Sequence, residues 1–146
     1  MFTLVYRSVV SPSLDNESLE KMLFKARDFN ESKNITGCLL HHKGEIIQLL
    51  EGGRAEVKSL FDKIKKDERH TNIIVLNMEE TFFRIFENWS MIYKDAGRSI
   101  YENSKKREQF EYVYKSSQSI YLPSKSKITL WTEVNSILDQ TVMYLN

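Results

Sequence analysis

The segment that most constrains the fold is the run EIIQLLE at residues 45–51, which glycines flank on both sides. In a strand its side chains alternate between two faces, so that Ile46, Gln48 and Leu50 share one face. Interior side chains of the opposite face are apolar as well, and two apolar faces predict a central strand that is covered on both sides. Gln48 is the exception, because a buried carboxamide without partners costs on the order of 1–3 kcal/mol. The pattern therefore predicts a polar partner for Gln48.

The other regular segments follow from local composition and periodicity. Strands are expected where β-branched and aromatic residues gather between turn residues, and helices where apolar residues recur every three or four positions. In chain order we expect a strand at 2–10, a helix from an Asp15 cap to near Asn30, strands at 34–42 and 45–51, a helix opened by Gly52-Gly53 that ends around 67–70, a strand at 72–78 and a strand around 89–93.

This order, β-α-β-β-α-β-β over residues 1–94, fits an α+β fold of the ferredoxin-like kind, with two helices on one face of a sheet. Gly97 marks an expected boundary between a domain at 1–97 and an extension at 98–146. Segments 99–117 and 124–145 look helical and are expected to cover the other face of the sheet. A loose amphipathic helix that binds a partner is the alternative for this extension. No fused output domain is expected.

Overall composition excludes several classes of function. A net charge of +1, from 21 Lys plus Arg against 20 Asp plus Glu, gives no electrostatic footprint for nucleic acid or an acidic membrane. The single cysteine, Cys38, excludes an intramolecular disulfide and a cysteine zinc cluster, and His41-His42 fits a solvated turn better than a metal site. Without a signal peptide or an apolar run of membrane-spanning length, we expect a cytoplasmic protein.

Three polar residues are candidates for a binding site. Tyr6 and Gln48 lie in the middle of strands, on the face assigned to the helices, and Asn30 lies on the apolar stripe of the first helix. A structural explanation exists for each, since Tyr6 and Gln48 can satisfy each other and Asn30 can end a helix. Converging under a helical layer, they would instead form a site for the polar edge of a flat heterocycle.

Weaker candidates have ordinary explanations. Asp67, Arg69 and His70 fall near a helix end, where the helix dipole favours cationic residues. Trp89 and Met91 fit a core by composition. Nucleotide-binding glycine motifs, hydrolase motifs and paired catalytic carboxylates are not evident in the sequence, which therefore gives no positive sign of an enzyme.

The chain resembles the BLUF family of flavin-binding blue-light sensors over about residues 1–94. The order and the spacing of the matching residues agree throughout, although no single piece is specific. The pieces that carry the resemblance are Tyr6-Arg7-Ser8, Asn30, Ile35-Thr36-Gly37, Gln48, Leu50-Glu51-Gly52, Asp67, Arg69-His70 and Trp89-Ser90-Met91.

The resemblance implies noncovalently bound FAD, with FMN and riboflavin as alternatives. By position, Gln48 would bond the flavin and Tyr6, and Asn30 would hold the pyrimidine edge of the ring. Apolar side chains of the sandwiching helices would be Met22 and Ile64, while Asp67, Arg69 and His70 would lie near the polar edge and ribityl chain of the flavin.

The resemblance also implies a photochemical switch rather than an enzyme. Tyr6 would give an electron and a proton that later return, and Gln48 would rotate or change tautomer, so that absorption shifts slightly to the red. Trp89 and Met91 would carry the change outward. The output is then expected to reach an unidentified signalling protein or to alter self-assembly as a homo-oligomer. A flavin-free ferredoxin-like ligand or interaction module is the alternative.

Overall fold

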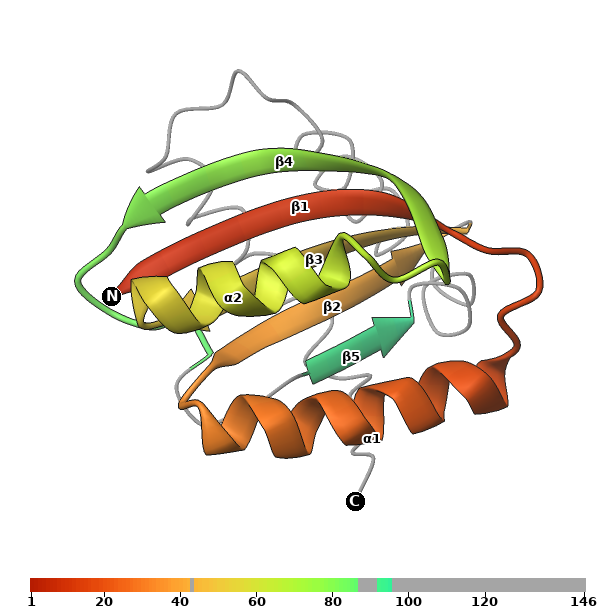
Figure 1. The fold of residues 1–146 in the computed structure, drawn as a ribbon, viewed down its shortest axis with the longest axis horizontal. Coiled ribbons are helices and arrows are strands. Elements are labelled where there is room, and N and C mark those ends of the chain that lie inside the picture. The colour runs from red at the N-terminus through yellow and green to blue at the C-terminus, as the bar shows by residue number, and fades with distance from the viewer. Residues whose placement is uncertain (43, 87–91, 96–146) are drawn as a thin grey trace, which may run out of the picture.

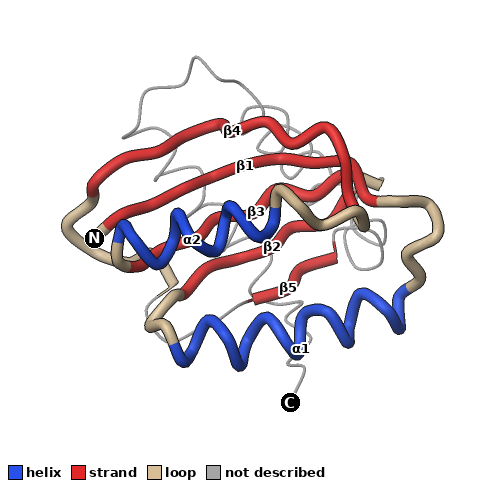
Figure 2. The backbone as a smooth tube through the Cα atoms, in the orientation of Figure 1, coloured by secondary structure: helices blue, strands red, loops and turns tan. Residues whose placement is uncertain are grey.

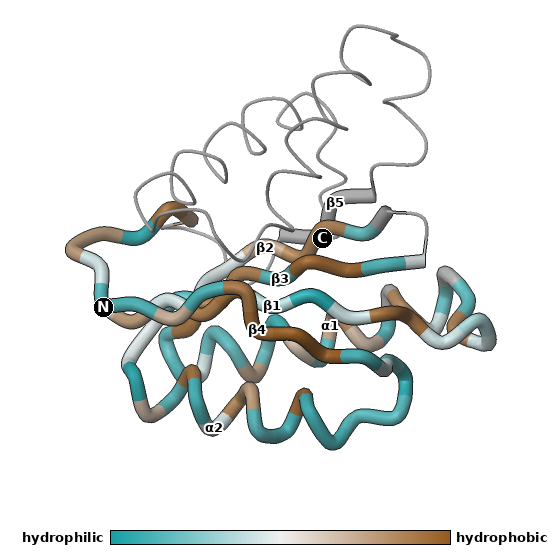
Figure 3. Tube along the Cα trace, turned by 90° about the horizontal axis from the view of Figure 1, so that it is seen from above, coloured by the Kyte–Doolittle hydropathy of each residue, from teal (hydrophilic) through white to brown (hydrophobic). Residues whose placement is uncertain are grey.

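The computed structural model describes residues 1–42, 44–86 and 92–95. They form a five-stranded sheet with two helices on one of its faces (Figures 1 and 3), and the expected ferredoxin-like order is confirmed. Along the chain the elements are β1 (Phe2–Val10), α1 (Asn16–Ser32), β2 (Thr36–His42), β3 (Glu45–Gly52), α2 (Arg54–Ile64), β4 (His70–Glu80) and β5 (Ile92–Asp95). The side chain of Asp15 caps α1 by accepting the amide N–H of Ser18 at 2.7 Å, as the sequence predicts.

The sheet has the strand order β4-β1-β3-β2-β5, which places β3 at its centre (Figure 2). β3 is antiparallel to both neighbours, and every residue of it from Ile46 to Gly52 is buried. The prediction of a central strand with two buried faces is therefore confirmed. β5 pairs in parallel with β2.

The core under the helices explains why these segments fold together. Leu19 and Leu23 of α1 and Val57 and Phe61 of α2 are buried in one cluster with apolar side chains of β1 and β3. Within each helix these two positions are four residues apart, so each helix presents one apolar stripe to the sheet. The cluster includes Tyr6, whose hydroxyl is the polar end of an otherwise apolar layer.

The connection between α2 and β4 corrects the predicted boundaries. α2 ends at Ile64, not around 67–70, and His70 is already the first residue of β4. After Ile64 the N–H groups of Lys66 and Asp67 bond the carbonyl oxygens three residues earlier, and the Asp67 carboxylate then accepts the backbone N–H of Arg69 at 3.0 Å and turns the chain. Asp67 and Arg69 therefore lie in a turn at the end of the helix layer.

The last predicted elements are only partly described. β5 is described at Ile92–Asp95, which overlaps the end of the expected strand around 89–93, while residues 89–91 lie outside the described residues. The expected boundary at Gly97 and the helices within 98–146 lie outside the described residues. Among the residues that are described, no helix has the length and apolarity needed to cross a membrane.

Gly37 on β2 offers a test of how closely β2 and β3 pack in the sheet. An added Cβ at Gly37 would lie 2.0 Å from the carbonyl oxygen of Leu49 on the paired strand. Backbone in the middle of a ladder cannot move away without loss of hydrogen bonds, so we expect Gly37→Ala to lower the free energy of unfolding by about 1–3 kcal/mol. Urea unfolding measures this loss.

Gly53→Ala is the matched control. There the added Cβ would meet the carboxylate of Glu56 at 2.1 Å, which is the far end of an exposed and flexible side chain. The carboxylate can swing away, so a loss below about 1 kcal/mol is expected. Equal losses in the two variants would contradict the assigned packing of β2 against β3.

Candidate functional site

A cavity of about 270 Å³ lies between the two helices and the sheet. Its size is close to the lower end of the range for small-molecule sites, roughly 300–1,000 Å³. Most of its lining is apolar and comes from α1, α2 and the facing strands. All eight residues predicted to contact a cofactor line this cavity: Tyr6, Met22, Asn30, Gln48, Ile64, Asp67, Arg69 and His70.

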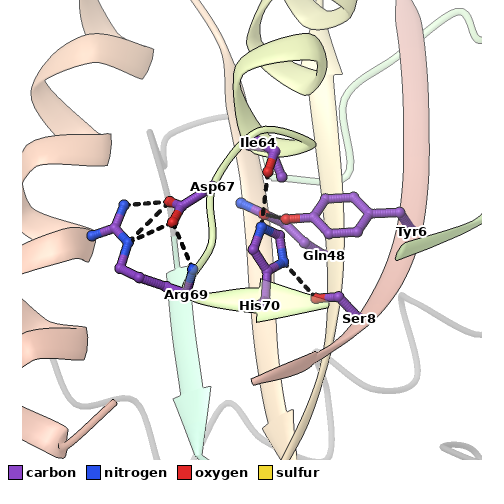
Figure 4. A network of polar contacts seen from close by, with 7 residues as sticks. All are labelled: Tyr6, Ser8, Gln48, Ile64, Asp67, Arg69 and His70. Atoms are coloured by element: carbon purple, nitrogen blue, oxygen red, sulfur yellow. Dashed lines mark hydrogen bonds and ion pairs between the residues drawn. The ribbon is translucent and has the colours of Figure 1, made fainter. Parts of the chain in front are cut away.

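Tyr6 and Gln48 both line the cavity where the sheet faces it, and a hydrogen bond joins their side chains (Figure 4). The two residues are direct partners in the β1–β3 ladder, and their side chains are 1% and 6% exposed. The Tyr6 hydroxyl donates to the Oε1 atom of Gln48. The polar partner that the sequence predicts for Gln48 is therefore Tyr6. Because Oε1 faces Tyr6, the amide group of Gln48 has a defined orientation at the cavity.

The protonation state of Tyr6 follows from its surroundings. Burial raises the pKa of the phenol far above its ordinary value, and the negative charge of Asp67 raises it further. The rings of Phe61 and His70 lie 5.2 Å and 6.3 Å from the ring of Tyr6, centroid to centroid. Tyr6 is therefore a neutral hydrogen-bond donor enclosed by other rings.

The helices supply the walls of the cavity. Met22 on α1 and Ile64 on α2 are partly buried and pack against the core cluster. Asn30, which is 1% exposed near the end of α1, brings a second carboxamide to the cavity lining. The result is an apolar slot between two helices, with one amide on α1 and another on β3. This donor set fits a flat heterocycle that presents carbonyl and N–H groups at its edge.

Asp67 and Arg69 form an ion pair beside the cavity. Arg69 Nε lies 2.8 Å and 3.0 Å from the two carboxylate oxygens of Asp67 (Figure 4). The hydrogen bond from Arg69 holds the pKa of Asp67 below its usual range. Asp67 is therefore ionised, and its charge acts on the nearby Tyr6 hydroxyl.

Both ring nitrogens of His70 have partners in the protein. Nε2 lies 2.9 Å from the backbone oxygen of Ile64, and Nδ1 lies 2.8 Å from the Ser8 hydroxyl. A carbonyl oxygen only accepts, so the neutral ring carries its proton on Nε2 and accepts from Ser8 at Nδ1. His70 thus ties the last turn of α2 to β1, while its ring also lines the cavity.

Two lysines and an aromatic residue of the site were not predicted. Lys25, Lys63 and Phe29 line the cavity, and the Lys63 ammonium lies 4.4 Å from the centroid of the Phe29 ring. Lysines on an amphipathic helix are ordinarily solvated, so the residue type alone does not suggest a role in a cavity. Only their positions around the helix relative to Met22 and Ile64 could have suggested them. The predicted switch residues Trp89 and Met91 lie outside the described residues.

Comparisons with known proteins agree with this geometry. The family model described as "BLUF: Sensors of blue-light using FAD" matches residues 1–92. The "Photoactivated adenylate cyclase subunit alpha-like protein FB" of Euglena gracilis is 43% identical over 77 residues, which are 51% of this chain and 7% of that protein. The "Blue light- and temperature-regulated antirepressor BluF" of Escherichia coli (strain K12) is 36% identical over 74 residues, which are 51% of this chain and 18% of that protein.

A solved structure extends the agreement to the fold. "BlsA photo-activated state" has a TM-score of 0.74 and 29% identity to this chain, over 90% of this chain and 92% of that one. The chain therefore spans a small part of the two curated relatives but nearly all of this structure. The family match covers more than half of the sequence and contains every predicted cavity residue. The chain belongs to the BLUF family, the sensors of blue light that use FAD.

Proposed function

We propose that this protein binds FAD noncovalently in the cavity between α1, α2 and the sheet, and that it senses blue light there. The observation that carries the proposal is the buried hydrogen bond between Tyr6 and Gln48, which both line the cavity. FMN and riboflavin share the ring system of FAD and are the alternatives to it.

Six of the cavity residues have a proposed part in holding the flavin. Asn30 would hold the pyrimidine edge of the ring through its carboxamide, and Met22 and Ile64 would enclose the two ring faces. Asp67, Arg69 and His70 would lie toward the polar edge and the ribityl chain. The ion pair between Asp67 and Arg69 and the bonds of His70 to Ser8 and Ile64 fix these side chains before a ligand arrives, and this preorganisation lowers the entropy cost of binding.

The proposed switch is the Tyr6–Gln48 pair itself. A bound flavin would supply the absorption of blue light and would be the acceptor for an electron and a proton. Tyr6 would give that electron together with its phenolic proton and later take both back. During this exchange the Gln48 amide would rotate or change tautomer and then form a stronger hydrogen bond to the C4 carbonyl of the flavin. A buried pair with two satisfied arrangements is bistable, so light can select between them.

The output of the switch is proposed to be an interaction. We place the protein in the cytoplasm, where it would act as a sensor without enzymatic activity of its own. Trp89, Met91 and the extension at 98–146 would relay the change to a signalling protein or to another copy of the chain in a homo-oligomer. The two curated relatives are named as a photoactivated adenylate cyclase subunit alpha-like protein and as an antirepressor, and this chain matches only 7% and 18% of their lengths, which supports an effector outside the matched region.

Two variants test the switch. Gln48→Leu is expected to keep bound flavin but lose the red shift, because leucine makes neither hydrogen-bond arrangement. Tyr6→Phe is expected to bind flavin without a photocycle, because the phenolic proton is gone. Absorption spectra before and after blue light measure both outcomes. Ile46→Val, which changes an apolar cavity residue on the same face of β3, is the control and should keep the shift. A normal red-shifted product in either test variant would contradict the proposal.

The raised pKa of Tyr6 predicts a pH dependence of stability. The unfolded phenol ionises at about pH 10. In the folded protein its pKa is higher, so the folded state retains a proton that the unfolded state loses. The contribution of Tyr6 to the free energy of unfolding is therefore fully present below about pH 10 and is lost as the pH rises further.

The measurement is urea unfolding of the wild type and of Tyr6→Phe across this alkaline range. The wild type is expected to lose more stability than the variant between about pH 9 and pH 11. Parallel losses in the two proteins would show that Tyr6 ionises in the fold as it does in the unfolded chain.

A further inference from the structure

A second buried polar cluster lies on the face of the sheet opposite the cavity. Its centre is Glu51, which is 1% exposed and lies three residues after Gln48 on β3. An odd separation along a strand places the two side chains on opposite faces. Thr36 on the paired strand β2 is buried beside Glu51, and Arg84, from the connection that follows β4, completes the cluster.

The Glu51 carboxylate binds two consecutive backbone amides of that connection. Its Oε1 atom accepts the N–H of Ile85 at 2.8 Å, and its Oε2 atom accepts the N–H of Phe86 at 3.2 Å. Oε2 also accepts the Thr36 hydroxyl at 3.2 Å. Both oxygens therefore hold neighbouring parts of the chain in place.

Arg84 closes the cluster from the other side. Its Nη1 atom donates to the Thr36 hydroxyl at 2.7 Å and to the backbone oxygen of Glu51 at 3.0 Å, and Nη2 donates to the backbone oxygen of Asn34 at 2.8 Å. The connection is thus hydrogen-bonded through its own backbone and through one of its side chains. Phe86, whose side chain is 1% exposed, adds an apolar anchor at the same place.

A carboxylate is an unusual choice for the interior of a central strand. Burial raises the pKa of Glu51, while the Ile85 and Phe86 amides, Thr36 and Arg84 oppose that shift. An apolar side chain would avoid the loss of hydration but would offer the Ile85 and Phe86 amides no acceptor. The cluster therefore fixes the position of the connection after β4 relative to β3. An apolar contact would fix that position less specifically, because it is not directional.

The segment that Glu51 holds comes directly before the chain that leads to β5. Gln48 and Glu51 are only about 10 Å apart along β3, at 3.3 Å per residue. We propose that Glu51 is a positioning residue that couples β3 to the β4–β5 connection, so that a light-driven rearrangement at Gln48 alters β5. This inference rests on the proposed function. A small shift of β3 at Gln48 would also move Ile85 and Phe86, because direct hydrogen bonds join their backbone amides to the Glu51 carboxylate.

Glu51→Gln in the full chain with FAD tests the coupling. Glutamine has nearly the same shape, but its amide nitrogen cannot accept an N–H, so one of the two backbone bonds is lost. Hydrogen–deuterium exchange of peptides covering 85–86 and 92–95 is measured in the dark and in blue light, together with the absorption spectrum. Glu45→Gln, a change of the other acid of β3, is the matched control and should behave as the wild type.

We expect Glu51→Gln to keep the bound flavin and the red shift. In the dark, exchange at 85–86 should rise at least about tenfold, because the lost bond had a charged acceptor. The difference between light and dark exchange at 92–95, present in the wild type, should disappear. A residue that only stabilises the fold would raise exchange in the dark and leave that difference intact.

Several results would overturn the coupling. One is that exchange at 85–86 is the same in the variant as in the wild type. Another is that the variant keeps the full light–dark difference at 92–95. The third is that the wild type shifts to the red but shows no light–dark difference at 92–95. A wild type that binds FAD but shows no red shift would instead overturn the proposed function. If Glu51→Gln does not fold, Arg84→Met loosens the same connection by removing the three donated hydrogen bonds of Arg84, and it should reduce the same difference.

Discussion

The burial of β3 on both faces is the constraint from which the rest of the structure follows. Its residues from Ile46 to Gly52 are all buried, so each polar side chain among them needs partners within the protein. Gln48 has Tyr6 on the helix face, and Glu51 has backbone amides and Thr36 on the other face. One strand thus carries two polar networks that point in opposite directions.

The network on the helix face has the properties that a light switch needs. Tyr6 is neutral and buried, and it is hydrogen-bonded to the side-chain amide of Gln48. That amide has a donor group, its NH₂, and an acceptor, its oxygen. A buried polar pair has few alternative partners, because water is excluded and the low dielectric strengthens each hydrogen bond. A rearranged Gln48 amide therefore has only a small number of distinct hydrogen-bonded arrangements. The walls from α1 and α2 are mostly apolar, and their polar members include Asn30, Lys25 and Lys63.

The sequence predicted the parts of the fold that depend on periodicity. Two apolar faces located β3 at the centre, and the equal parity of Tyr6 and Gln48 with their apolar neighbours placed both residues under the helices. Asn30 followed from the helical stripe of α1. The resemblance to a family then suggested roles for Met22, Ile64, Asp67, Arg69 and His70 in holding a flavin, which periodicity alone did not suggest and which remain proposals.

Features that depend on individual side-chain hydrogen bonds, whether local or between distant segments, were not predictable in this way. The end of α2 was placed too late, because the turn is made by the Asp67 side chain rather than by a glycine or proline. His70 was predicted near a helix end, yet it begins β4 and binds Ser8, 62 positions earlier. The partner of Glu51 was hidden for the same reason, since Ile85 lies 34 positions away and offers only its backbone.

The most direct test of the account is the visible absorption spectrum of the purified wild-type protein with FAD, before and after a blue flash and then during recovery in the dark. The account predicts a structured flavin spectrum that shifts to the red and returns. Bound flavin without a shift would contradict the switch assigned to Tyr6 and Gln48. Failure to bind FAD at all would contradict the cavity assignment and favour a flavin-free ligand or interaction module.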